Sequence, residues 1–149
     1  MKKKLKTLLI GFGNVAEKIG NDKMMKKFIK FQSHAQVLKA HPNFMWDAVV
    51  DSNKNRREVA KKKWKIPFVA DSLSKLPKDY TPDVVVLTTP PEKRINFLKK
   101  INEKKAIIVE KPLGLSLAKS NEFKRICDEK RLIVQVNYFR RFDSTIKTL

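Results

Sequence analysis

The chain has 149 residues, of which 42% are hydrophobic and 33% are charged. This length predicts a single domain with a core of its own, and the composition excludes both a membrane protein and a disordered tail. The formal net charge of +19 attracts polyanions even without a designed site, so nucleic acid has to be considered as a partner.

Apolar runs alternate with polar helical stretches along the whole chain. Runs rich in Leu, Ile and Val predict buried strands over 5–10, 45–50, 84–87, 106–109 and 132–139, and the Pro-containing run 66–69 predicts an edge strand or a loop. Helices are expected over 55–64, after Pro91 and after Ser116, a plausible N-cap. Their inward positions are Val59, Ala60, Ile95, Leu98, Ile101, Phe123, Ile126 and Cys127. Such alternation predicts a doubly wound α/β fold with a mostly parallel sheet, in which residues 1–149 form one domain.

A glycine-rich turn follows the first predicted strand directly. Gly11-Phe12-Gly13-Asn14-Val15-Ala16 fits the pattern G-x-G-x-x-A and is expected to open a helix. In a dinucleotide-binding turn, Gly11 permits the tight turn, Gly13 lets the backbone approach a diphosphate, and Ala16 allows close packing of helix on strand. The diphosphate would rest on the unpaired amides at the start of that helix. The other interpretation is a glycine turn without a ligand.

The second strand is expected to end at Asp51, where a carboxylate would accept hydrogen bonds from the ribose hydroxyls of the adenosine. An anion at this place disfavours a 2′-phosphate and indicates NAD. Arg56 and Arg57 lie close enough in sequence to offer NADP a partner, so the cofactor is NAD or NADP, with NAD preferred.

Asp51 stands 40 residues after Gly11, about twice the usual spacing of roughly 20. The excess lies in 20–36, which we interpret as a lengthened first helix or an inserted turn. Its apolar residues at helical spacing are expected to belong to the core: Met24, Met25, Phe28, Ile29 and Phe31.

Two further motifs follow predicted buried strands and so fall at the carboxyl edge of the sheet, where open α/β folds bind ligands. In Thr88-Thr89-Pro90-Pro91, the threonines can offer hydroxyls to cofactor or substrate, although a rigid turn explains the motif equally well. In Glu110-Lys111-Pro112, the lysine can donate a proton or stabilise an alkoxide, and Glu110 can orient it and accept from a ribose hydroxyl. A solvated Glu-Lys pair before a proline is the alternative.

Other classes of function find little support. The opening Met1-Lys2-Lys3-Lys4 lacks a following apolar region and a cleavage site, so we expect no targeting signal, and no apolar run is long enough for a membrane span. The single Cys127 excludes an internal disulfide and, with two histidines, cannot build a closed zinc site. The lysines are spread along the chain without a basic aromatic helix, so we expect no designed nucleic-acid binding. A cytoplasmic domain without a metal is expected.

The order of these motifs resembles the Gfo/Idh/MocA family of NAD(P)-dependent oxidoreductases from about Leu5 to Asp143. Besides the turn, Asp51, Thr89-Pro90-Pro91 and Glu110-Lys111-Pro112, the likeness includes Val136-Asn137-Tyr138 and Arg141-Phe142. The resemblance implies a Rossmann fold and hydride transfer between a nicotinamide and a carbinol of a sugar, sugar nucleotide or polyol. It implies that Lys111 is catalytic beside the nicotinamide, that Glu110 contacts the nicotinamide ribose, and that Thr88, Thr89 and Pro90 line the cofactor. Arg141 would lie on the substrate side.

The sequence departs from this family in three places. Arg94 stands where a histidine is usual, and Lys104 where a glycine commonly precedes the fifth strand. The family's second α+β domain, which supplies most substrate contacts, is not part of these 149 residues. We therefore expect cofactor binding with weak or absent turnover, and self-association is possible. The alternatives are a non-catalytic NAD(H)-binding regulator or scaffold and a basic polyanion-binding protein.

Overall fold

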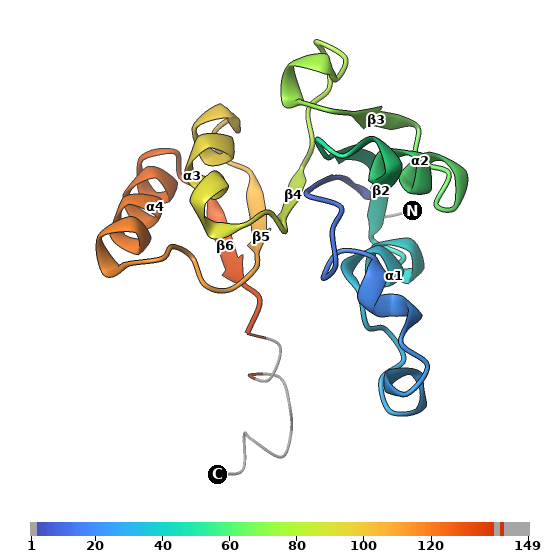
Figure 1. Ribbon diagram of the computed structural model, residues 1–149. Helices are drawn as coiled ribbons and strands as arrows, with labels where there is room; N and C mark the ends of the chain where they lie inside the picture. The colour runs from blue at the N-terminus through green and yellow to red at the C-terminus, as the bar shows by residue number, and fades with distance from the viewer. Residues whose placement is uncertain (1–2, 139–140, 142–149) are drawn as a thin grey trace. The chain divides into compact units, whose positions relative to one another are not determined.

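The computed structural model describes residues 3–138 and residue 141 (Figure 1). The chain is made of two compact units, residues 1–89 and residues 90–149, and each is described by itself below. The described residues contain no helix that is long and apolar enough to cross a membrane.

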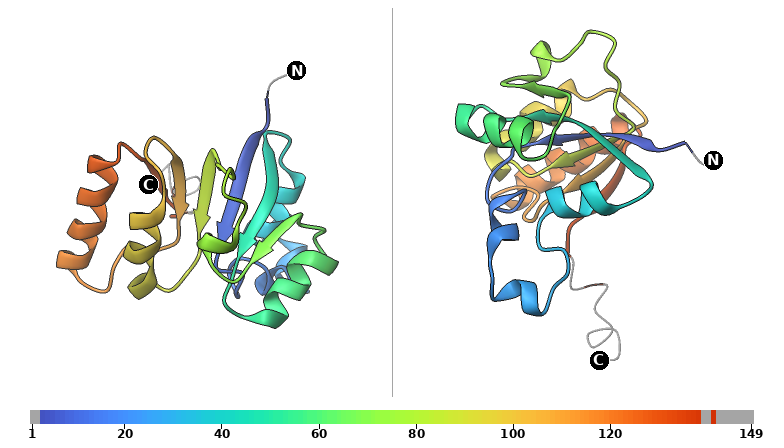
Figure 2. Two further views of the ribbon diagram at one scale, coloured as in Figure 1. Left: turned by 90° about the horizontal axis from the view of Figure 1, so that it is seen from above. Right: turned by 90° about the vertical axis from the view of Figure 1, so that its right-hand side faces the viewer.

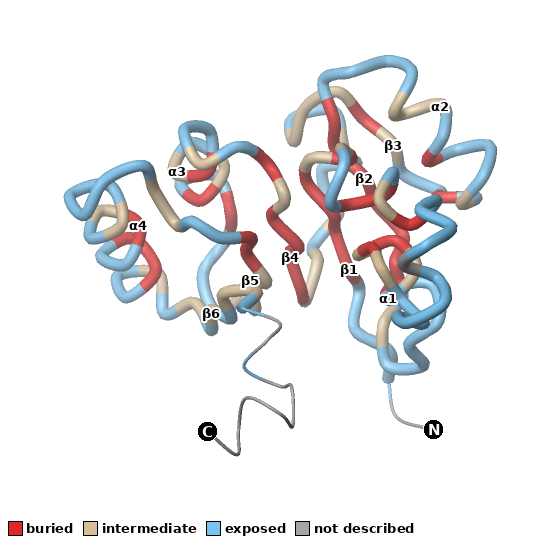
Figure 3. Tube along the Cα trace, turned by 60° about the horizontal axis from the view of Figure 1, so that its bottom comes forward, coloured by how far each residue is buried: buried red, intermediate tan, exposed pale blue. Residues whose placement is uncertain are grey.

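The first unit is built on four parallel strands in the order β3-β2-β1-β4. These are β1 (Leu5–Ile10), β2 (Phe44–Val50), β3 (Phe68–Ala70) and β4 (Val84–Leu87), each overlapping a predicted run. The run 66–69 forms an edge strand that begins only after Pro67, since β3 is the outermost strand of this unit. Figure 3 shows β1, β2 and β4 as largely buried, and Leu9, Val49 and Val86 are 0% exposed. Both faces of these strands are covered, and for this reason apolar residues stand at successive positions and do not alternate with polar ones.

Two α-helices pack on the strands of this unit. The helix α2 (Lys54–Lys62) packs on β2 and β3 with Ala60 fully buried, whereas Val59, predicted to face inward, is exposed. The helix α1 (His34–Ala40) packs on β2 and begins with a capping box, in which Ser33 and Gln36 satisfy each other's backbone amides. Short 3₁₀ turns lie at η1 (Lys18–Asn21), η2 (Met25–Lys27) and η3 (Leu73–Lys75).

The second unit contains the parallel strands β5 (Ala106–Val109) and β6 (Ile133–Val136) and the helices α3 (Pro91–Lys100) and α4 (Leu117–Glu129). The two helices lie side by side (Figures 1 and 2). Ser116 caps α4 as predicted, by accepting from the Lys119 amide, and the predicted inward residues of α4 are buried. The last strand ends at Val136, earlier than predicted, and the predicted Phe139 lies outside the described residues.

The largest difference from the sequence prediction lies between β1 and α1. No long helix follows the glycine turn: residues 14–17 form one turn, η1 follows, and residues 22–32 make an excursion before α1 (blue to cyan below α1 in Figure 1). The inserted turn is therefore the correct interpretation, and the lengthened helix is wrong. The assignment to the core is also wrong for the four apolar residues whose burial is described, because all are exposed: Met24, Phe28, Ile29 and Phe31. The prediction for the Met25 side chain falls outside the described part.

Candidate functional site

The glycine turn is shaped by contacts that only a glycine at position 11 permits. Gly11 has a φ of +91°, and a Cβ on it would lie 2.9 Å from the backbone nitrogen of Thr89. At Gly13, a Cβ would lie 3.3 Å from Nη1 of Arg56, a flexible side chain that can give way. The tight turn predicted for Gly11 is confirmed, whereas the room beside Gly13 is bounded by an arginine.

The amides of this turn are the groups that fit a diphosphate. The Phe12 amide donates to Oδ2 of Asp51 at 2.6 Å and is therefore already satisfied. The amides of Gly13, Asn14 and Val15 make no hydrogen bond to any residue in the described part of the chain. The Glu17 amide closes the turn by donating to the Gly13 carbonyl at 3.0 Å. Three successive amides without a partner in the described residues are the kind of donor group that phosphate oxygens accept from.

Asp51 lies at the end of β2, where it was predicted, but part of its acceptor capacity is used within the protein. Its Oδ2 accepts from Phe12, its Oδ1 accepts from the Asn53 amide at 2.7 Å, and the residue is 6% exposed. Nη1 of Arg56 lies 3.5 Å from Oδ2. The carboxylate thus fixes the glycine turn to the β2–α2 connection and keeps lone pairs for a ribose hydroxyl.

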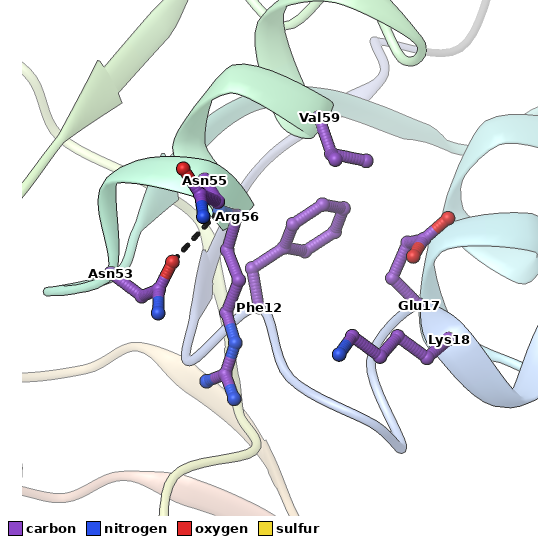
Figure 4. Close-up of a pocket in the computed structure, with 7 residues that line it drawn as sticks. All are labelled: Phe12, Glu17, Lys18, Asn53, Asn55, Arg56 and Val59. Carbon is purple, nitrogen blue, oxygen red and sulfur yellow. Dashed lines mark hydrogen bonds between the residues drawn. The ribbon is translucent and has the colours of Figure 1, made fainter.

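A pocket of about 200 Å³ opens between the glycine turn and α2 (Figure 4). In this view, Lys18 extends towards Phe12 and Arg56 from the opposite side, and Glu17 points away from Arg56. The Glu17 carboxylate is engaged by Nζ of Lys63 at 2.5 Å. The residues that line the pocket are Phe12, Glu17, Lys18, Asn53, Asn55, Arg56 and Val59.

The threonines after β4 are held close to the turn, in a manner that the sequence did not predict. The Thr88 hydroxyl donates to the backbone carbonyls of Ile10 and Gly11, so its proton is committed to the protein. Thr89 is buried against Gly11, and Pro90 is the exposed N-cap of α3. The pair therefore shapes the turn, and the Thr88 oxygen keeps only an acceptor role for a ligand.

The second unit carries the remaining predicted residues. Glu110 is 7% exposed at the end of β5, and its Oε1 accepts from Nδ2 of Asn137, which follows β6, at 2.5 Å. Lys111 is exposed. Arg141 is also exposed. The structure thus shows Asn137 holding Glu110, a contact that the motif order alone did not indicate.

The sequence identified Arg94 only as a departure from the family pattern and did not reveal its buried contacts. Arg94 is 2% exposed, and Nη1 donates to the carbonyls of Glu110 and Pro112, on both sides of Lys111. Burial lowers the pKa of Arg94, and the nearby Glu110 carboxylate opposes that shift. Its spacing from Leu98 and Ile101 places it on the apolar face of α3, and that placement is the signal that could have found it.

The described residues contain no cluster of three or more side chains suited to a metal ion. The structure brings together two groups of predicted residues. One is in the first unit (Gly11, Phe12, Gly13, Asn14, Val15, Asp51, Thr88 and Thr89) and the other in the second (Glu110 and Lys111, with Asn137).

Parallel strands, the glycine turn with unpaired amides and an acidic residue ending the second strand define a dinucleotide-binding domain of the Rossmann class. The model of the oxidoreductase family with an NAD-binding Rossmann fold, GFO_IDH_MocA, matches residues 5–138. The chain belongs to this family, and its fold class is the predicted doubly wound α/β fold. No curated protein matches the chain closely enough to count as a relative.

Solved structures share the fold at low sequence identity. The chain is similar to a dehydrogenase from Clostridium difficile (24% identity, TM-score 0.76), covering 98% of this chain and 43% of that one. It is also similar to myo-inositol 2-dehydrogenase from Lactobacillus plantarum (20% identity, TM-score 0.71), covering 98% of this chain and 40% of that one. A third similar structure is scyllo-inositol dehydrogenase from Lactobacillus casei with bound NAD(H) and scyllo-inositol (18% identity, TM-score 0.71), covering 98% of this chain and 39% of that one. The chain thus spans about 40% of the length of these neighbours.

Proposed function

We propose that this chain is the coenzyme-binding part of an NAD-dependent dehydrogenase that oxidises a CH–OH group of a sugar, sugar nucleotide or polyol. Membership of the oxidoreductase family supports the reaction class. The inositol dehydrogenases among the structural neighbours support a polyhydroxylated substrate. The single observation that carries the proposal is the row of unpaired amides at Gly13, Asn14 and Val15, beside the Asp51 carboxylate.

In this proposal, the three amides bind the diphosphate, and Asp51 accepts from a hydroxyl of the adenosine ribose. The bound coenzyme supplies the hydride acceptor. Gly11 keeps the turn against Thr89, and Phe12 anchors it, since its ring is 2% exposed and lies 5.9 Å from the ring of Trp46. A rigid turn fixes the direction of its amides before the ligand arrives, and so lowers the ordering cost of binding.

The role of Lys111 rests on the family resemblance. We propose that its ammonium exchanges the proton of the reacting hydroxyl and steadies the developing negative charge on that oxygen. The supporting observation is that the loop is held on both sides of Lys111 by Arg94, while Lys111 itself is exposed. Glu110, oriented by Asn137, would accept from the nicotinamide ribose, and Arg141 would face the substrate.

Turnover needs more than these residues. Holding a substrate in the right orientation can lower the activation barrier by about 7–11 kcal/mol. In the first neighbour only 40% of the chain is matched, so most of that protein lies outside the part that this chain resembles. We therefore expect these 149 residues to bind NADH and to turn over substrate weakly or not at all.

The test is a calorimetric titration of the chain with NADH. Gly13→Asp places a carboxylate beside the unpaired amides, where it competes with and repels a diphosphate, and should weaken binding at least about 100-fold. Asn121→Asp is the matched control, because it adds the same charge at an exposed position of α4 and should leave binding unchanged. If wild type gives no heat with NADH, or Gly13→Asp binds as tightly as the control, the proposal is wrong.

A further inference from the structure

We infer that the excursion before α1, residues 22–32, is a loop that attaches the protein to the surface of an anionic phospholipid bilayer. Its apolar side chains would enter the outer layer of the bilayer, and its lysines would pair with the lipid phosphates. This attachment is peripheral and needs no segment that spans the membrane. The inference does not depend on the coenzyme site.

The excursion exposes apolar side chains that the fold leaves uncovered. Phe28 is 83% exposed, the highest value among the large hydrophobic side chains that the structure describes. Met24, Ile29 and Phe31 are exposed as well. The excursion extends away from the strands of its own unit (blue to cyan in Figures 1 and 2). Apolar side chains gathered on one exposed loop are typical of a surface that meets a partner.

Hydrogen bonds give this loop a defined shape. Nε2 of Gln32 donates to the Asp22 carbonyl at 3.3 Å, so the first and last residues of the excursion are joined. The Lys26 amide donates to the same carbonyl at 3.2 Å. The Lys27 amide donates to the Met24 carbonyl at 3.2 Å and closes the turn η2. Compact loops with joined ends are frequently functional, and a preformed loop loses less conformational freedom when it binds.

The charge of the excursion favours a negatively charged partner. Its one acidic residue is Asp22, whose Oδ1 accepts from the Met24 amide at 2.8 Å. The lysines alternate with the apolar residues, and Nζ of Lys30 lies 5.4 Å from the centre of the Phe31 ring. A second copy of this chain would bring the same cations together, so self-association through the loop is disfavoured. The four lysines of the excursion are all exposed and form no ion pair within the described part of the chain: Lys23, Lys26, Lys27 and Lys30.

The size and chemistry of the loop favour a lipid surface over a protein or a nucleic acid. A stable protein interface takes about 800 Å² from each partner, supplied by roughly 20–30 residues, and residues 22–32 form only one short loop. Single-stranded nucleic acid stacks its bases on aromatic rings, whereas Met24 and Ile29 are aliphatic. A bilayer accepts separate apolar side chains without a matching shape, and lysines beside them can reach its phosphates.

The first experiment measures the partition coefficient of the 149-residue chain on vesicles of phosphatidylcholine, alone or with about 30% phosphatidylserine. We expect binding to the anionic vesicles only. Phe28→Ser keeps the charge and should weaken this binding about tenfold or more, the range for burial of one large apolar side chain. The matched control is Leu117→Ser, because Leu117 is 77% exposed at the start of α4, and it should leave the binding nearly unchanged.

A second pair of variants tests the charge. Lys26→Ala combined with Lys27→Ala should weaken partition onto the anionic vesicles by about 10- to 30-fold, the effect of two lysines at an anionic surface. Lys61→Ala combined with Lys62→Ala is the control, because it removes the same net charge from exposed positions of α2. We expect the control pair to have a clearly smaller effect.

A third measurement distinguishes insertion from adsorption. The tryptophan fluorescence of Phe28→Trp should be quenched by vesicles with brominated acyl chains, beyond the change seen in the wild-type chain. Leu117→Trp places the same probe at the exposed control position and should show no such additional quenching.

Each contrary result overturns the inference. The wild-type chain would fail to bind anionic vesicles, or Phe28→Trp would be quenched no more than Leu117→Trp. Equal losses for each variant and its control would show that binding follows the net charge of +19 alone. If a single-stranded oligonucleotide binds in place of the vesicles, and Phe28→Ser weakens that binding, the partner is a nucleic acid. None of these results bears on NADH binding, so the proposed function is tested separately.

Discussion

Replacing Arg94 by methionine removes a buried cation from the second unit and keeps a long, unbranched side chain in its place. The guanidinium of Arg94 is the donor to the carbonyls of Glu110 and Pro112, and the residue is 2% exposed. Methionine fills much of the space but cannot donate. Two carbonyls of the Glu110–Pro112 loop would therefore lose a charged donor where little water can replace it.

The size of the effect follows from these contacts. A hydrogen bond from a charged group contributes about 1.5–3 kcal/mol, and a buried carbonyl left without a donor costs about 1–3 kcal/mol. Part of this loss is offset, because the variant no longer desolvates a guanidinium; burial is the main cause of the lowered pKa of Arg94. We expect a net loss of about 2–4 kcal/mol in the free energy of unfolding, out of a total of about 5–15 kcal/mol for a domain.

Urea unfolding followed by far-UV circular dichroism measures this loss. The matched control is Arg125→Met, because the Arg125 side chain is 62% exposed and pairs with Glu129 on the surface of α4. An exposed pair of this kind contributes less than about 1 kcal/mol. Equal midpoints for the two variants would refute the view that Arg94 holds the loop, and so would an Arg94→Met variant as stable as wild type.

Three further predictions concern other parts of the chain. Burial raises the pKa of the Cys127 thiol to about 11 from an ordinary value of 9.0, so the neutral thiol's contribution to stability is complete below pH 9 and is lost as the pH rises through 11. The urea midpoint should therefore be lower at pH 10.5 than at pH 8. Iodoacetamide at pH 8 should also label the native chain at least about tenfold more slowly than the unfolded chain. Burial and a 2.6 Å hydrogen bond to Asp47 raise the pKa of Tyr80 above its usual range, so an absorbance titration should show a component beyond that range which Tyr80→Phe removes. Gly11→Ala should cost more than about 2 kcal/mol, seen as a lower melting temperature, because the new Cβ meets the Thr89 backbone at 2.9 Å in a left-handed conformation; a melting temperature equal to wild type would contradict this.

The strands were predictable because their signal is local and strong. Two short apolar runs rich in β-branched residues, without polar alternation, occupy Val84–Leu87 and Ala106–Val109. Such a run is typical of a strand that is buried on both faces of a parallel sheet. The Ser116 cap was equally predictable, since a serine before an amphipathic stretch carries its own hydrogen-bond acceptor.

The region between β1 and α1 was not predictable in the same way. Met24 and Phe28 recur at helical spacing, and that pattern indicates a buried face only if another element exists to cover it. In the structure they are 64% and 83% exposed, because the chain leaves the helical path at Asp22. Periodicity reports which residues share a side and does not report whether that side meets a partner.

At the candidate site, sequence order identified the positions but not the hydrogen bonds between them. Asp51 and Thr88 directly follow their strands as predicted, yet the Asp51 carboxylate accepts from the Phe12 amide and the Thr88 hydroxyl donates to backbone carbonyls. Contacts between residues 39 or 77 positions apart follow from the topology, and one sequence does not reveal them. The same holds for Asn137 and Glu110, 27 positions apart.

The interrupted first helix explains why the glycine turn can keep its amides in place without a long helix behind it. The Ala35 amide donates to the Ala16 carbonyl at 2.9 Å, so α1 supplies the hydrogen bond that the fourth residue of a continuous helix would supply. Gly20 packs closely on Ser33 and Gln36, the pair that caps α1, and this contact ties the two pieces together. Because the attraction of a helix start for an anion falls off within its first turn, the residues inserted after that turn do not alter the amides at Gly13–Val15 that we propose as the diphosphate site.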